Sequence, residues 1–211
     1  MIGAHDIDAL FVMKPANLAY LTGDGRPCAL GLLARSGSFV VAVPECDVPS
    51  VRVLSAAADI RSFRSEEEMF HGFRDVLAEL GLTESTIALE KNFFDAALHE
   101  VFTQHILAQA NVVSATPVLS RLRMLKDADE VELMRDAGRV ADIGMTAAVA
   151  AAREGAVETM VAAEAEYSMR KAGAEGWAAP VYVASGWRSA MAHGPASGSN
   201  TRKLRSRVAT Q

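Results

Sequence analysis

The chain has 211 residues, of which 50% are hydrophobic and 22% are charged, and its formal net charge is −5. This composition is typical of a globular protein and excludes disordered and collagen-like chains. The apolar runs are all much shorter than the ~18 residues of a membrane span. The first residues lack a basic region followed by an apolar core, so we expect neither a membrane segment nor a secretory signal. Two cysteines provide no disulfide framework and favour a reducing cytoplasm.

The charge is unevenly distributed along the chain. Residues 1–175 contain all 26 acidic residues and 16 of the 21 basic residues, a net charge of −10. Residues 176–211 contain five basic side chains and no Asp or Glu. This last segment therefore offers no carboxylate side chain as a metal ligand, acid or base. The strongly negative remainder of the chain disfavours a nucleic acid as partner.

The first half of the chain alternates strand and helix signals. Apolar runs predict strands at residues 9–13, 29–34, 39–43, 86–89 and 112–113. The turn-like residues 35–38 join the second and third of these runs into a hairpin. Ser65 and Glu68 have the spacing of a capping box before a helical stripe that ends near Gly81, and a further helix covers residues 94–106. This alternation indicates an α/β domain.

The second half has a different pattern. Apolar residues at helical spacing predict one helix over 127–152 and another over 157–172, which we expect to be antiparallel and joined by a tight turn. Many of their contact residues are Ala or Gly, so the helices can lie close to what they cover. Residues 180–184 resemble a strand. The change of pattern between the two halves indicates a domain boundary near residues 116–122. We therefore divide the chain into residues 1–118 and 119–211.

Two loops resemble functional motifs. The segment Gly23–Cys28 begins like a dinucleotide-binding loop, but Cys28 stands where the third glycine belongs and Pro27 would disturb the following helix start. The segment Val181–Pro195 leads from an apolar run through Ser185-Gly186 to His193. A histidine in such a loop is most often only a loop residue, although loops also carry a large share of functional side chains.

Taken together, several segments resemble the creatinase, prolidase and aminopeptidase P family of pita-bread hydrolases. They occur in the family's order, at residues 15–23, 122–126, 155–158 and 185–194. The resemblance implies an α/β creatinase-type N-terminal domain, residues 1–118, followed by a pita-bread α+β domain that is incomplete in residues 119–211. It also implies a homodimer or a larger assembly.

The resemblance implies a chemistry as well. Most members of this family use two divalent metals, such as Mn, Zn or Co, held by two Asp, one His and two Glu, to activate a water that attacks the bond before a proline or a related C–N bond. His193 matches the family's histidine on the substrate side, which precedes the metal ligands. We therefore identify His193 as the candidate catalytic residue, because an imidazole titrates near neutral pH and can move a proton.

The chain departs from the family after His193. All five metal ligands of the family would follow this histidine, and the sequence continues without a carboxylate side chain. We therefore expect this chain to bind no metal and to be inactive alone, and to act on a small peptide or a creatine-like substrate only when completed. Two alternatives remain open: a non-catalytic binding or dimerisation module, and an anion binder that uses Arg202, Lys203, Arg205 and Arg207. We also expect residues 1–118 to fold independently and an apolar face to be exposed in residues 119–211.

Overall fold

The computed structural model describes residues 6–191 and 194–197. The chain divides into two compact units, residues 1–125 and residues 126–211. Within the described residues, no helix is both long and apolar enough to cross a membrane.

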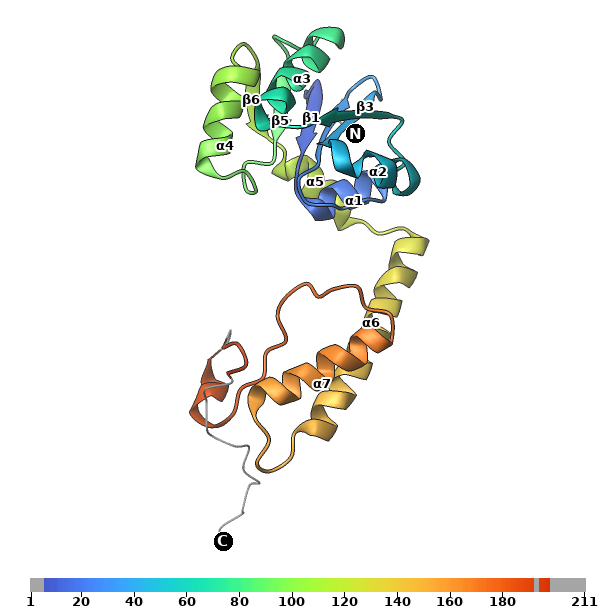
Figure 1. The fold of residues 1–211 in the computed structure, drawn as a ribbon, viewed down its shortest axis with the longest axis vertical. Coiled ribbons are helices and arrows are strands. Elements are labelled where there is room, and N and C mark those ends of the chain that lie inside the picture. The colour runs from blue at the N-terminus through green and yellow to red at the C-terminus, as the bar shows by residue number, and fades with distance from the viewer. Residues whose placement is uncertain (1–5, 192–193, 198–211) are drawn as a thin grey trace. The chain divides into compact units, whose positions relative to one another are not determined.

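The first unit is built on a six-stranded sheet with the strand order β4-β3-β2-β1-β5-β6 (Figure 1). The strands are β1 (Ala9–Val12), β2 (Leu30–Ala34), β3 (Phe39–Pro44), β4 (Asp59–Phe63), β5 (Thr86–Leu89) and β6 (Asn111–Ser114). β1, β2 and β3 pair antiparallel, whereas β1 with β5, β5 with β6 and β3 with β4 pair parallel. All the strands expected from the apolar runs in the first half are present, together with β4, which the sequence patterns did not indicate.

Helices cover both faces of this sheet. They are α1 (Pro15–Thr22), α2 (Val48–Leu54), α3 (Glu66–Glu79), α4 (Ala96–Val101) with the π-helical segment Phe102–Ile106, and α5 (Thr116–Met124). A short 3-10 turn, Glu45–Asp47, precedes α2. On one face the sheet packs against α3 and the π-helical segment, and on the other against α1, α2 and α5.

Strand periodicity explains the two cores. Ala9 and Phe11 belong to one buried cluster, whereas Leu10 and Val12 belong to the other. Successive side chains of a strand point to opposite faces, so a strand that is apolar throughout must be covered twice. The expected α/β layer structure is therefore confirmed.

Helix α5 joins the first unit through its side chains. Val118 and Leu119 are buried in the cluster that also contains Leu10 and Val12. The boundary that we expected between residues 118 and 119 falls inside this helix, and the compact unit extends to Leu125.

The second unit contains two helices packed along each other, α6 (Ala128–Ala151) and α7 (Glu158–Lys171) (Figure 1). Asp127 and Glu130 form a reciprocal capping box at the start of α6. Gly144 of α6 lies directly against Met169 of α7: a β-carbon at Gly144 would be 2.6 Å from the γ-carbon of Met169. The small residue thus allows the close approach that the composition predicted.

The expected strand at residues 180–184 is wrong. These residues have no strand assignment, and all six strands of the described chain belong to the first unit. A strand requires a neighbouring strand for its backbone hydrogen bonds, and none of the described residues of the second unit provides one. The segment instead leads into a 3-10 turn, Gly186–Ala190.

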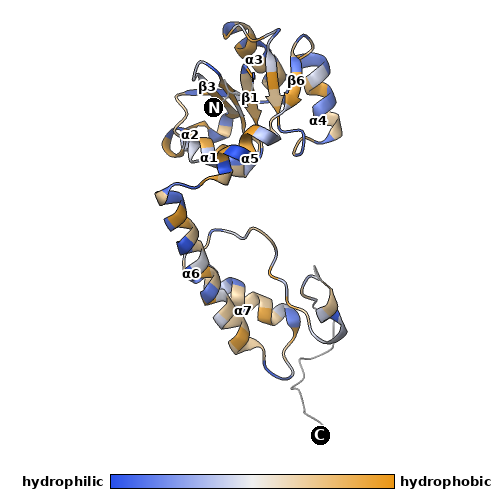
Figure 2. Ribbon diagram, turned by 180° about the vertical axis from the view of Figure 1, so that it is seen from behind, coloured by the Kyte–Doolittle hydropathy of each residue, from blue (hydrophilic) through white to orange (hydrophobic). Residues whose placement is uncertain are grey.

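Large apolar side chains are exposed on both helices of the second unit. Figure 2 marks hydrophobic residues of these two helices in orange. They include Met134, Met145 and Val149 on α6 and Met160 and Tyr167 on α7. Their spacing places the three α6 residues along one side of that helix and the two α7 residues along one side of the other. We refer to these two stripes together, five residues in all, as the apolar helix face.

Candidate functional site

A buried carboxylate lies at the start of helix α7. Gly155, with φ of +88°, turns the chain after α6, and Val157 is extended where the new helix begins. Glu158 is the first residue of α7, and its solvent exposure is 0%. A carboxylate at this end of a helix is favoured by the helix dipole, but a fully buried charge also requires direct partners.

Those partners come from the segment after residue 184. The Oε1 atom of Glu158 accepts hydrogen bonds from the backbone N–H of Ser185 at 2.8 Å and from its hydroxyl at 2.9 Å. The Oε2 atom accepts from Nε of Arg188 at 3.2 Å and from the backbone N–H of Ser197 at 3.3 Å. One carboxylate therefore binds residues at both ends of the segment Ser185–Ser197, and we call the described residues of this segment, 185–191 and 194–197, the clamped loop.

The charge state of Glu158 follows from these contacts. Burial raises the pKa of the Glu158 carboxyl, but the hydrogen bonds from Ser185 and Ser197 and the positive charge of Arg188 outweigh it and hold the pKa below its ordinary value. Glu158 is therefore ionised at neutral pH.

Further bonds cross the clamped loop. Nη2 of Arg188 donates to the carbonyl of Pro195 at 2.5 Å, and the hydroxyl of Ser189 donates to the carbonyl of Ala184 at 3.2 Å. Gly194 is buried, and a β-carbon there would lie 3.1 Å from the β-carbon of Met191. The described parts of the loop are thus linked to one another as well as to Glu158.

His193, the candidate catalytic residue, lies outside the described residues. In the sequence it follows Ala192 and precedes Gly194. Its catalytic role stays a prediction. The basic residues 202, 203, 205 and 207 also lie outside the described part of the chain.

A second buried carboxylate organises the first unit. Glu90 follows β5 and is only 1% exposed. It accepts hydrogen bonds from the backbone N–H groups of Met13 and Lys14, at 2.6 and 2.7 Å, and from the side-chain amide of Asn17. Arg123 of α5 donates to the Asn17 carbonyl oxygen at 2.7 Å. Because these bonds connect β5, the start of α1 and α5, we assign Glu90 a structural role.

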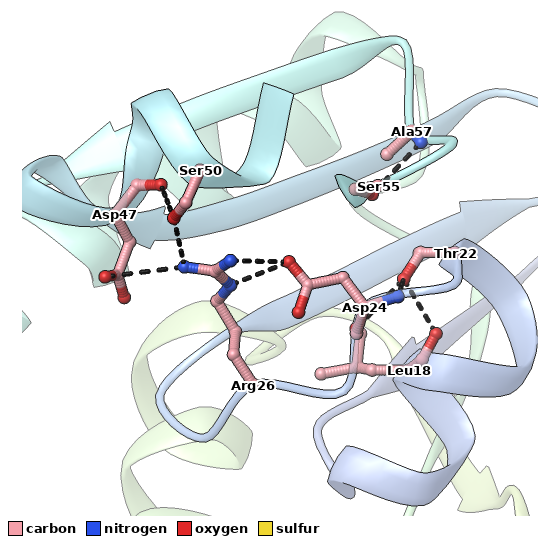
Figure 3. Close-up of polar contacts among 8 residues, drawn as sticks. All are labelled: Leu18, Thr22, Asp24, Arg26, Asp47, Ser50, Ser55 and Ala57. Carbon is pink, nitrogen blue, oxygen red and sulfur yellow. Dashed lines mark hydrogen bonds and ion pairs between the residues drawn. The ribbon is translucent and has the colours of Figure 1, made fainter. Parts of the chain in front are cut away.

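The loop that begins like a dinucleotide-binding motif is held by an ion-pair network centred on Arg26 (Figure 3). Arg26 donates to Asp24 at 2.8 Å and to the hydroxyl of Ser50 at 3.0 Å, and it pairs with Asp47 at 3.4 Å. The hydrogen bond and charge of Asp24 are the chief causes that raise the pKa of Arg26. The guanidinium is thus occupied by carboxylates, as in a structural ion pair.

The described residues provide no metal site. Within residues 6–191 and 194–197, no group of three or more His, Cys, Asp or Glu side chains is arranged to hold a metal ion. His71 and His105 line one open hollow beside α3, together with Glu66 and Glu67, but they do not form such a group. These residues do not fit the pair of divalent metals that the resemblance implies. That the chain binds none stays a prediction.

Comparison with protein families places this geometry in context. Residues 1–125 match the creatinase/prolidase N-terminal domain, and residues 132–208 match metallopeptidase family M24. The chain belongs to the creatinase/prolidase family. The segment that matches the M24 model contains α7, Glu158 and the clamped loop.

Individual relatives agree with this membership. A Xaa-Pro dipeptidase from Pyrococcus furiosus is 30% identical over 92% of this chain and 52% of that protein. A Xaa-Pro dipeptidase from Pyrococcus horikoshii is 28% identical over 92% of this chain and 52% of that protein. The chain therefore spans about half the length of the curated relatives it matches.

Solved structures of the family have the same fold. The prolidase from Pyrococcus furiosus matches with a TM-score of 0.80 and 25% identity over 96% of this chain and 59% of that chain. A dipeptidase from Mycobacterium ulcerans matches with a TM-score of 0.77 and 26% identity over 97% of this chain and 54% of that chain. The creatinase-type α/β fold with a partly present second domain is confirmed.

The sequence patterns missed two of the residues that organise these sites. In the sequence, Glu158 is the last residue of the helix-start segment 155–158, and Arg188 belongs to no motif. The available signal was the position of Glu158 at a helix start directly after a glycine turn. Nothing in the local sequence connects that position with Ser185 or Ser197, because their contact joins residues 27 and 39 positions apart.

Proposed function

We propose that this chain carries the N-terminal domain and the first part of the catalytic domain of a metal-dependent Xaa-Pro peptidase, and that it does not hydrolyse peptides alone. The observation that supports this proposal most directly is the match of residues 132–208 to metallopeptidase family M24, because this range contains Glu158 and His193. The related Xaa-Pro dipeptidases support a small peptide as substrate class. The chain spans about half of them, and its sequence has no carboxylate side chain after Glu175.

The same proposal includes the two-domain organisation. It assigns the first compact unit to a creatinase/prolidase-like N-terminal domain and the second to the N-terminal portion of a pita-bread domain. It also includes a cytoplasmic location, because Cys28 and Cys46 are both free.

The test is a hydrolysis assay on the purified 211-residue chain. Release of proline from Xaa-Pro dipeptides, and hydrolysis of creatine, would be measured with Mn²⁺, Zn²⁺ or Co²⁺, with calorimetric titration of each metal. We expect no turnover above the metal-only control and no stoichiometric metal binding, since one histidine does not satisfy the ligand number of such a site. A complete prolidase serves as the positive control. Turnover that disappears in His193→Asn would overturn the proposed inactivity and support His193 as the catalytic residue.

The apolar helix face favours a second candidate, a non-catalytic dimerisation module. Its five exposed side chains would lose contact with water in a homodimer formed through α6 and α7. Analytical ultracentrifugation would compare the chain with the variant Met145→Glu/Met160→Glu and with the control Glu164→Gln. We expect the parent chain and the Glu164→Gln control to be dimers and the double glutamate variant to be a monomer. A monomeric parent chain would remove this candidate.

A further inference from the structure

We propose that Glu158 is a positioning residue that fixes the shape of the clamped loop. The inference rests on the proposed function only where it connects this loop with hydrolysis through His193. Its structural part concerns the described contacts alone. It assigns to Glu158 a role beyond starting helix α7, because the carboxylate joins two segments that are distant in the sequence.

The hydrogen bonds to Glu158 come from both ends of the clamped loop. Ser185 and Ser197 stand at the two ends of the loop, and both bind the same carboxylate. Arg188 adds a second connection, since its guanidinium binds Glu158 through Nε and the carbonyl of Pro195 through Nη2. A loop whose ends share one rigid partner has fewer conformations than a free segment of the same length. Removing that partner therefore frees the loop as a whole.

The Glu158 side chain acts only as an acceptor in these hydrogen bonds. An ionised carboxylate only accepts, and its two oxygens provide about four lone-pair sites for the four donated bonds. Glutamine at this position would replace one oxygen by an NH₂ group. In one orientation the NH₂ would face Arg188 and the Ser197 N–H, which can only donate. In the other it would face the Ser185 N–H, which can only donate, and the Ser185 hydroxyl, which could rotate to accept while the backbone bond is lost. Glu158→Gln therefore preserves the size of the side chain but breaks the clamp in either orientation.

The contact between helices α6 and α7 is separate from the hydrogen bonds that Glu158 accepts. Val161, Ala162 and Ala165 form the buried side of α7, and Met169 packs against Gly144. None of these side chains takes part in the hydrogen bonds of Glu158. The loop should therefore loosen in Glu158→Gln while the helices remain packed.

The experiment is hydrogen exchange on the full chain, followed by mass spectrometry of peptides from residues 186–196 and 128–151. The variants are Glu158→Gln and the matched control Glu164→Gln, a substitution of an exposed glutamate on the same helix. We expect the loop to exchange about tenfold faster or more in Glu158→Gln, with unchanged exchange in α6. Equal rates in the two variants would overturn the inference, and so would a uniform increase over the loop and α6, which indicates a general structural role.

Hydrogen exchange measured over a pH series separates the effect of the Glu158 charge from the effect of its side-chain size. Among the described residues, Arg188 is a charged group that pairs with Glu158, at 3.2 Å. The lowered pKa of Glu158 means that the clamp is complete above the unfolded value of about 4.3 and is lost as pH falls through the lower folded value. After correction for intrinsic exchange, loop opening should rise with acid in the parent chain and stay flat in Glu158→Gln, while α6 is unchanged. Identical profiles would overturn the inference.

These measurements require no catalytic turnover. A chain that fails the hydrolysis test can still show the clamp, and a chain that hydrolyses Xaa-Pro peptides can still lack it. The two proposals therefore fail independently.

Discussion

At the scale of single residues, two buried carboxylates dominate the polar structure. Glu90 and Glu158 are 1% and 0% exposed, and each accepts hydrogen bonds from segments far away in the sequence. A buried charge is tolerated only where donors replace the lost water. Every buried side-chain nitrogen and oxygen of the described residues has a partner. Each carboxylate therefore acts as a junction between segments that the backbone does not connect.

The first prediction concerns Glu90. Glu90→Gln removes a charged acceptor from Met13, Lys14 and Asn17 and leaves a buried donor facing donors. We expect the variant to lower the free energy of unfolding of the first unit by about 2 kcal/mol, the order of a lost hydrogen-bonded charge. Urea denaturation would measure this, with the exposed Glu84→Gln as control. Equal midpoints for both variants would contradict the structural role of Glu90.

At the scale of elements, local signals define most starts and ends, and neighbours modify them. Ser65 accepts from the N–H of Glu68, as the capping-box spacing predicts, but the Glu68 carboxylate accepts from the backbone and guanidinium of Arg64. The expected reciprocal box is thus only half formed. A competing cation next to the helix start explains the difference, because charge-assisted bonds are stronger than neutral ones.

The second prediction uses two glycines of α6. A β-carbon at Gly138 would meet no atom within 4 Å, whereas one at Gly144 would press on Met169. Gly138→Ala should stabilise the second unit by about 0.5–1 kcal/mol through helix propensity. Gly144→Ala should be less stable than Gly138→Ala by about 1–2 kcal/mol, because the gain in propensity is opposed by overpacking. Urea denaturation followed by helical circular dichroism compares the pair, and equal effects would show that the helices do not need the close approach.

At the scale of the whole molecule, the two units differ in how much apolar surface they bury. The first contains two buried clusters on opposite faces of a covered sheet. Among the described residues of the second, the buried apolar side chains are Val161, Ala162 and Ala165. Burial of apolar area is the main source of stability, at roughly 25 cal/mol per Å². The second unit therefore has less to hold it folded when it stands alone.

The third prediction follows from this difference. Brief digestion with trypsin should cut first within residues 126–191, where Arg135 and Arg139 are exposed, and leave a resistant fragment that ends near residue 125. Cleavage of a loosely packed unit tracks its local opening. Mass spectrometry of the time course identifies the fragments. Equal resistance of the two units would contradict the expected independence of the first and would favour burial of the apolar helix face in an assembly.

The sequence by itself determined the alternation of strands and helices, the hairpin of β2 and β3, the long helices α6 and α7, and the family. These features depend on periodicity, turn residues and short motifs, which act over a few positions. The sequence patterns did not indicate α1, α2, α5 or β4, which are short and are held by neighbouring elements. It wrongly indicated a strand at residues 180–184, since strand formation depends on a partner.

Only the tertiary structure decided what Glu158 and Glu90 do. The sequence shows a glutamate at a helix start and another after a strand, positions at which a carboxylate is most often solvated. Their partners lie 27 to 77 residues away and meet them only when the chain is folded. Local patterns carry no record of such distant contacts. The physical reason is that a buried charge is stabilised by the donors around it in space, and the fold alone brings those donors together.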